Sequence, residues 1–107
     1  MSAPSTSKRL AYLEKVNAEG KADSFARYAL ALEYKSLGRI DDARTAFEAL
    51  RAADPAYVPM YLMCGSMLAD ADRKDEARVW LEAGVDAARR AGDGKALGEI
   101  ESALAGL

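Results

Sequence analysis

One segment occurs twice in this chain, and the internal repeat restricts the possible folds more than any other feature. The segment GRIDDARTAFEAL begins at Gly38, and a second version, DRKDEARVWLEAG, begins at Asp72. Six of the thirteen positions are identical, and Phe47 is matched by the apolar Leu81. At a period of roughly 34 residues, each copy of the repeat corresponds to one supersecondary unit. Such a unit cannot bury its apolar face alone, so neighbouring copies must stack on one another.

Apolar residues recur at helical spacing through most of the sequence. Alanine is abundant and β-branched residues are scarce, which favours helix over strand. Glycine and Asp-Pro breaks then predict six helices, at about residues 7–19, 24–37, 41–53, 57–70, 74–91 and 95–107. Because the connections are short, consecutive helices should be antiparallel neighbours. The predicted fold is an all-α solenoid of antiparallel helix pairs.

These residues resemble the tetratricopeptide repeat family, whose 34-residue pattern is W-x2-L-G-x2-Y, then A-x3-F, then P. The matching positions are Leu30, Ala31, Tyr34, Ala43, Phe47 and Pro55 in the first copy, and Tyr61, Cys64, Gly65, Leu68, Ala77 and Leu81 in the second. Two departures are Arg27, where the family prefers Trp, and Arg89, which replaces the second proline. Small residues at equivalent positions of the two copies, such as Ala43 and Ala77, allow the helices of a repeat to pack closely. Large residues, such as Phe47 and Leu81, fill the space beside them.

The repeat register divides the chain into five parts. We expect a disordered tail at 1–6, an N-terminal half-repeat or capping helix at 7–20, a first repeat at 24–57, a second at 58–91 and a C-terminal capping helix at 94–107. Leu13 aligns with Phe47, but Arg9 stands in the place of the small Ala43, so the first part is degenerate.

The composition does not favour catalysis or metal binding. The chain has no histidine and a single cysteine, Cys64, so the usual general base and the commonest metal ligand are missing. The acidic group Asp70, Asp72, Asp75 and Glu76 lacks the spacing and glycine of a calcium loop, and fits a turn and helix start instead. We expect no enzyme, no cofactor and no metal.

Charge and hydropathy argue against two classes of partner. The formal net charge is −2 and no basic stripe is present, which disfavours nucleic-acid binding; Arg89 and Arg90 suit the end of a helix. No apolar run approaches the roughly 20 residues that span a membrane. The N-terminus also lacks the apolar core of a signal peptide, so we expect a cytoplasmic location without membrane contact.

Two further features allow more than one interpretation. Met60, Met63 and Met67 form a helical stripe with Cys64, for which core packing is favoured over a promiscuous binding surface. Trp80 either packs against the last helix or contacts a partner, and the sequence leaves both open.

The family resemblance implies a protein–protein interaction module, such as a small adaptor or scaffold subunit. In such arrays the first helix of each repeat lines the concave face. By register, the candidate partner-binding residues are Phe25, Tyr28, Leu32 and Lys35 in the first repeat and Leu62, Ser66 and Ala69 in the second.

These residues do not provide the Lys, Arg and Asn of the family's clamp for a C-terminal carboxylate. An apolar groove with one cation favours a helix or extended peptide that presents apolar anchors. Coverage of the same face by the N-terminal helix is a nearly equal alternative.

Two other functions remain open. One is a structural, self-associating homodimer. The other is a small-molecule-binding or enzymatic helical domain, which would need a closed pocket lined by converging polar groups.

Overall fold

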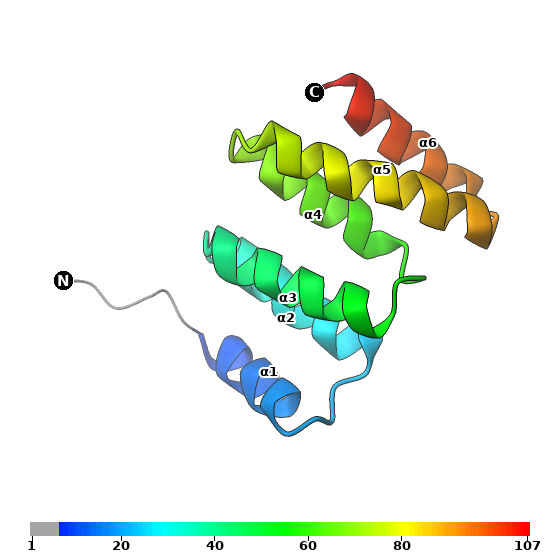
Figure 1. Cartoon of the computed structure of the whole chain (residues 1–107). Coiled ribbons are helices and arrows are strands. Elements are labelled where there is room, and N and C mark those ends of the chain that lie inside the picture. The colour runs from blue at the N-terminus through cyan, green and yellow to red at the C-terminus, as the bar shows by residue number, and fades with distance from the viewer. Residues whose placement is uncertain (1–6) are drawn as a thin grey trace. The chain divides into compact units, whose positions relative to one another are not determined.

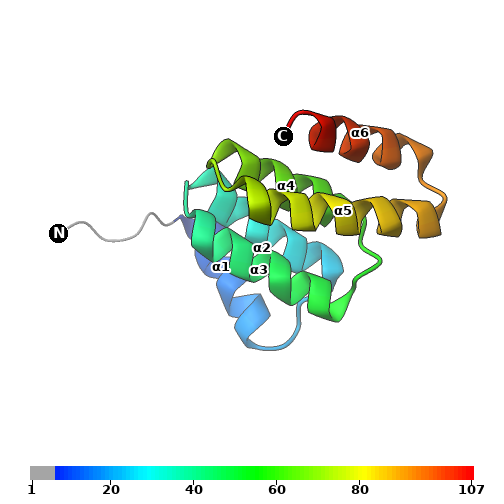
Figure 2. The same cartoon turned by 45° about the horizontal axis from the view of Figure 1, so that its top comes forward.

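The computed structural model describes residues 7–107, and this part of the chain is built from helices and their connections (Figures 1 and 2). It contains six helices and no strand: α1 Lys8–Ala18, α2 Ser24–Ser36, α3 Ile40–Ala53, α4 Pro59–Asp70, α5 Lys74–Ala91 and α6 Gly94–Ala105. The all-α prediction is confirmed. The tail expected at 1–6 lies outside the described residues.

Among the helix starts, the largest difference from the expectation is at α4, which begins at Pro59 rather than at 57. Proline suits the first helical turn because its φ is already helical and its missing N–H would have no partner there. The start of α2 agrees with the expectation. The Asp23 side chain accepts a hydrogen bond from the Ala26 N–H and caps the helix.

Contacts within the chain separate it into two units, each described by itself. Unit 1 ends at Ala53 and contains α1, α2 and α3, whereas unit 2 begins at Asp54 and contains α4, α5 and α6. In unit 1, α2 packs against both α1 and α3. In unit 2, α5 packs against α4 and α6, and α4 also contacts α6. Each unit is therefore one helix pair with one additional helix.

The helix pairs of the two units are closed by the same turn. Gly38 follows α2 with φ 74°, and Asp72, the equivalent residue of the second copy, takes φ 60°. The next N–H donates back across the turn in both copies, from Arg39 to the Tyr34 carbonyl at 2.9 Å and from Arg73 to the Leu68 carbonyl at 2.8 Å. This pattern is the Schellman closure of a helix end. The sequence repeat is thus also a repeat of backbone geometry.

The apolar residues of unit 1 that carry the repeat pattern are buried. Ala31 and Ala43, the small residues of the pair, are both 0% exposed, as is Phe47. From α1, Leu10 is fully buried and Leu13 nearly so. Small residues inside the pair allow close approach of α2 and α3, while the larger ones fill the remaining space.

In unit 2 the same positions pack more tightly. A Cβ placed on Gly65 would lie 2.6 Å from the Leu81 side chain, so α4 and α5 meet at a distance that only glycine allows. In the same helix pair, Tyr61 and Trp80 pack with ring centroids 6.1 Å apart. Trp80 is 6% exposed, so it is too buried to be an exposed binding residue, and its ring partner lies on α4 rather than on the last helix.

A second apolar cluster holds α6 in unit 2. Its buried members are Val58, Leu81, Ala88 and Ile100, and partly buried residues such as Leu97 pack around them. The methionine stripe of α4 is also mostly internal, since Met60, Met67 and Cys64 are at most 2% exposed. These burials favour the core interpretation of the stripe.

Candidate partner-binding surfaces

Four of the predicted partner-binding residues form one stripe along α2, which we call the α2 stripe: Phe25, Tyr28, Leu32 and Lys35. At about 100° per residue, they fall within an arc of roughly 80°. Phe25 is 69% exposed, and the other three are half-buried. The Tyr28 ring packs edge-on against Phe47 of α3, at a centroid distance of 6.4 Å. The stripe is therefore anchored to α3 at Tyr28 and open at Phe25.

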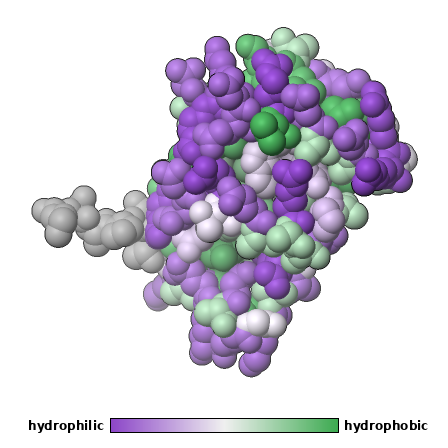
Figure 3. All heavy atoms as spheres, in the orientation of Figure 1, coloured by the Kyte–Doolittle hydropathy of each residue, from purple (hydrophilic) through white to green (hydrophobic). Residues whose placement is uncertain are grey.

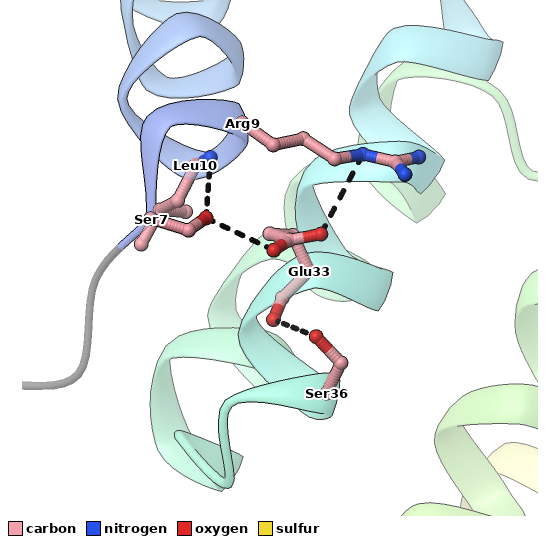
Figure 4. Close-up of polar contacts among 5 residues, drawn as sticks. All are labelled: Ser7, Arg9, Leu10, Glu33 and Ser36. Atoms are coloured by element: carbon pink, nitrogen blue, oxygen red, sulfur yellow. Dashed lines mark hydrogen bonds and ion pairs between the residues drawn. The ribbon is translucent and has the colours of Figure 1, made fainter.

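The helix α1 is attached to α2 partly by polar contacts at Glu33 (Figure 4). The Ser7 hydroxyl donates to the Glu33 carboxylate at 3.0 Å, and the Arg9 guanidinium lies 3.5 Å from the same group. The Tyr34 hydroxyl donates to the Glu14 carboxylate at 2.5 Å. Glu33 and Tyr34 lie roughly 120° or more around the helix from the centre of the α2 stripe. These contacts direct α1 away from that stripe.

The environment of Tyr34 suits this attachment. Burial and the hydrogen bond to Glu14 raise the pKa of Tyr34 to about 12, because both disfavour the phenolate. The Arg39 guanidinium lies 4.8 Å from the centre of the Tyr34 ring and also pairs with Asp42 at 2.9 Å. Tyr34 is thus a neutral donor that connects α1, α2 and the start of α3.

The other three predicted residues lie on α4 in unit 2: Leu62, Ser66 and Ala69. They share one side of the helix and are all half-buried. Leu62 packs against the apolar cluster that contains Leu81 and Ile100. Part of the Leu62 side chain is therefore used inside unit 2, and this set presents less apolar surface than the α2 stripe does.

Unit 2 has a further concave feature that the sequence did not predict, which we call the α5–α6 groove. It is open to solvent, has a volume of about 480 Å³ and is lined by Glu82, Val85 and Asp86 of α5 with Glu101 and Leu104 of α6. Because these residues come from two separate helices, no local motif could have indicated them. In the sequence, the only indication of this groove was that apolar and acidic residues lie close together on each of the two helices.

The described residues 7–107 contain no group of three or more His, Cys, Asp or Glu placed to hold a metal ion. None of the helices in this range is both long and apolar enough to cross a membrane. On the face shown in Figure 3, hydrophilic side chains cover most of the surface and hydrophobic ones form separate patches. The candidate surfaces are therefore the α2 stripe, the three residues on α4 and the α5–α6 groove.

Antiparallel helix pairs that follow the register of the sequence repeat, with small residues between the paired helices, define a helical-repeat protein of the tetratricopeptide class. Solved structures show the same fold. The crystal structure of a tetratricopeptide repeat domain protein from Salinibacter ruber is 36% identical, with a TM-score of 0.70, and the match covers 78% of this chain and 92% of that one. A solution structure of a tetratricopeptide repeat domain protein from the same organism is also 36% identical, with a TM-score of 0.70 over 77% of this chain and 83% of that one.

A third similar structure, a solution structure of a protein from Bordetella parapertussis, is 25% identical, with a TM-score of 0.77 over 92% of this chain and 86% of that one. No protein-family model matches the sequence, and no curated protein is significantly similar to it. The identity and coverage of the Salinibacter match are sufficient for an assignment: the chain belongs to the tetratricopeptide repeat family. Membership of this family indicates a helical-repeat module for protein interaction.

Proposed function

We propose that this chain is a non-catalytic adaptor or scaffold module that binds an apolar helix or extended peptide on the α2 stripe. The observation that carries the proposal is the exposure of Phe25. Phe25 is 69% exposed, so most of its apolar surface is not covered by its own chain, and it lies in line with two further large apolar side chains. Exposed apolar surface of this kind is typical of interaction sites.

The position of the α1 contacts on α2 supports the proposal that the α2 stripe is open to a partner. The polar contacts of α1 lie at Glu33 and Tyr34, on another side of α2, so they leave Phe25 and Leu32 accessible from solvent. This arrangement favours an available stripe over coverage by the N-terminal helix. Lys35 at the end of the stripe adds one cation, which would select a partner with an acidic residue beside its apolar anchors.

The same proposal gives the α4 set a smaller role. Leu62, Ser66 and Ala69 offer contacts on unit 2, but Leu62 is already engaged with the α6 cluster. We also propose that 24–57 and 58–91 act as the two repeat units, with 7–20 and 94–107 as the terminal caps. The hydrogen-bonded turns at Gly38 and Asp72, which are equivalent positions of the two copies, support this register.

The test is a capture experiment that compares Phe25→Glu with the wild-type chain. Because Phe25 is exposed, the substitution should leave helix content unchanged while placing a charge on the apolar stripe. We expect Phe25→Glu to lose a protein that wild type captures from its native lysate, and that protein should then bind the purified wild-type chain.

Val79→Glu is the matched control, since Val79 is also apolar and is 60% exposed but lies on α5. It should retain the captured protein. Circular dichroism on both variants verifies folding. Leu62→Glu is less suitable as a test because it would place a charge next to the α6 cluster. Retention of every captured protein by a folded Phe25→Glu variant would move the binding site off α2.

A further inference from the structure

The α5–α6 groove combines an apolar floor with an acidic rim. Val85 and Leu104 are half-buried at its floor, and both pack against the buried cluster that holds α6. Glu82, Asp86 and Glu101 line the same groove and are exposed. The partner that suits such a groove has an apolar anchor between positive charges.

The three carboxylates are not neutralised locally. None of Glu82, Asp86 and Glu101 lies within an ion-pair distance of a cation in the described part of the chain. Arg78 and Arg89 are near them in sequence on α5, but they form no ion pair in that same range. An acidic rim without partners remains available to an incoming cation.

A surface of the opposite kind occurs on α1. Lys8, Tyr12 and Lys15 lie within a roughly 60° arc on the exposed side of the helix, since they are separated by four and three residues. Tyr12 is 67% exposed, and both lysines are exposed. Glu19, at the end of the same side, pairs with Lys21 at 3.8 Å. We call Lys8, Tyr12 and Lys15 the α1 stripe.

The two units also differ in overall charge. Residues 1–53 contain nine Lys or Arg and seven Asp or Glu, a net charge of +2, whereas residues 54–107 contain six and ten, a net charge of −4. Two copies of this chain would therefore attract each other when unit 1 of one approaches unit 2 of the other. The same charges oppose contacts between like units.

We propose that the α5–α6 groove of one copy binds the α1 stripe of a second copy. Tyr12 lies on the floor formed by Val85 and Leu104, and Lys8 and Lys15 reach the carboxylates on either side of it. The two lysines are about 10 Å apart along α1, and their long stems allow them to span the groove while covering its apolar edge. This proposal is independent of the α2 stripe, which takes no part in the contact.

Contacts of this type are head-to-tail. Each copy has one stripe and one groove, so association uses different surfaces of the two partners and leaves a stripe and a groove unused at the ends. The area of one helix in one groove is small, and we expect weak, reversible association that grows with concentration. Because the rim contacts are charged and exposed, the association should weaken strongly as salt shortens the screening length from about 10 Å at 0.1 M to about 3 Å at 1 M.

The experiment is sedimentation velocity of the full chain over a concentration series at low and high ionic strength. At low ionic strength, we expect the wild-type weight-average sedimentation coefficient to rise with concentration. Lys8→Glu/Lys15→Glu and Glu82→Lys/Glu101→Lys should each weaken association about tenfold or more, because each replaces attraction by repulsion at the rim. Combining all four substitutions in one chain should restore association.

A net-charge control separates this contact from general electrostatics. Lys21→Glu/Arg27→Glu lowers the net charge of unit 1 as much as the α1 variant does, but it touches neither the stripe nor the groove residues. It should associate like wild type, and Phe25→Glu should do so as well. Circular dichroism and thermal melting confirm that every variant is folded.

Three results would overturn the proposal. The first is a wild-type chain that remains monomeric across the whole concentration series at low ionic strength. This result would overturn the proposal even if the groove of the monomer bound a synthetic basic amphipathic peptide. The second is association that persists in both charge-reversed variants. The third is failure of the folded four-substitution chain to regain association.

Discussion

The two units contain the same helix pair but attach their additional helix by different physical means. In unit 2, α6 is held by an apolar cluster in which Ile100 and Leu81 are fully buried. In unit 1, two leucines of α1 are buried, and the remaining attachment is polar, through Glu33 and Tyr34 of α2. An equal sequence repeat therefore does not produce equal packing at the two ends of the chain.

This difference has consequences for stability. Apolar burial is non-directional and is not screened by salt, whereas ion pairs and hydrogen bonds to ionisable groups depend on ionic strength or pH. The attachment of α6 should consequently change little with ionic strength and pH. The attachment of α1 should respond to solution conditions.

The largest expected effect comes from Ile100→Ala in α6. Removal of a fully buried isoleucine side chain should lower the free energy of unfolding by about 3 kcal/mol, through lost burial and the cavity left behind. Urea titration followed by circular dichroism measures it. Glu33→Gln, which weakens the α1 attachment, should cost less than about 1 kcal/mol because the ion-pair partner of Glu33, the Arg9 side chain, is 71% exposed. If the two variants lose equal stability, the contrast between the units is wrong.

A pair of glycine substitutions tests the tight packing of unit 2. A Cβ on Gly84 would lie 2.6 Å from the Tyr61 Cβ and 3.2 Å from the Ile100 side chain, whereas a Cβ on Gly98 meets nothing within 4 Å. Gly84→Ala should therefore destabilise by about 2 kcal/mol, because helices must move apart.

The control is the same chemical change at Gly98, in the interior of α6. There, alanine should stabilise by up to about 1 kcal/mol through its higher helix propensity. Urea titrations of the two variants should move the unfolding midpoint in opposite directions. A gain of stability in Gly84→Ala as well would show that propensity, and not helix approach, controls the effect at Gly84.

Much of this fold could be predicted from sequence because the repeat pattern encodes local structure and burial. The positions of Ala43 and Ala77, for example, follow from the repeat period, and both are fully buried. The candidate site was less predictable. Register placed Tyr28 and Leu62 at equivalent positions, but it could not show that Leu62 packs against the α6 cluster, because this depends on how the capping helix docks.

The polar contacts of α1 were also beyond sequence reasoning. Glu14 and Tyr34 belong to different helices, and their hydrogen bond depends on the crossing of those helices rather than on a spacing rule. The α5–α6 groove was missed for the same reason. Side chains that meet through tertiary packing leave no pattern in a single sequence, unless periodicity places both on core faces.

Tyr34→Phe tests the polar attachment of unit 1. Loss of the hydrogen bond to Glu14 should lower the free energy of unfolding by about 1 kcal/mol at neutral pH. The wild-type contribution should also depend on alkaline pH. The folded pKa of Tyr34 is raised from 10.0 to about 12, so the neutral form is favoured in the folded chain. Its contribution is fully present below about pH 10 and is lost as pH rises through about 12.

Urea midpoints measured from about pH 8 to about pH 12 check this sign. The difference in stability between wild type and Tyr34→Phe should shrink toward the alkaline end. Tyr12→Phe is the matched control, since Tyr12 belongs to the same unit but is 67% exposed. If the difference in stability between wild type and Tyr34→Phe does not change across this pH range, ionisation of Tyr34 does not weaken the attachment of α1.

The smallest expected effect compares the two equivalent turns. Gly38 and Asp72 both have positive φ, at 74° and 60°, although glycine adopts this region without strain and aspartate does so less readily. Asp72→Gly should therefore stabilise unit 2 by about 0.5 kcal/mol, and Gly38→Asp should destabilise unit 1 by a similar amount. The gain is limited because glycine also increases the entropy of the unfolded chain. Thermal melting of both variants measures the pair, and a loss of stability in Asp72→Gly would mean that the aspartate side chain contributes more to its turn than the backbone strain costs.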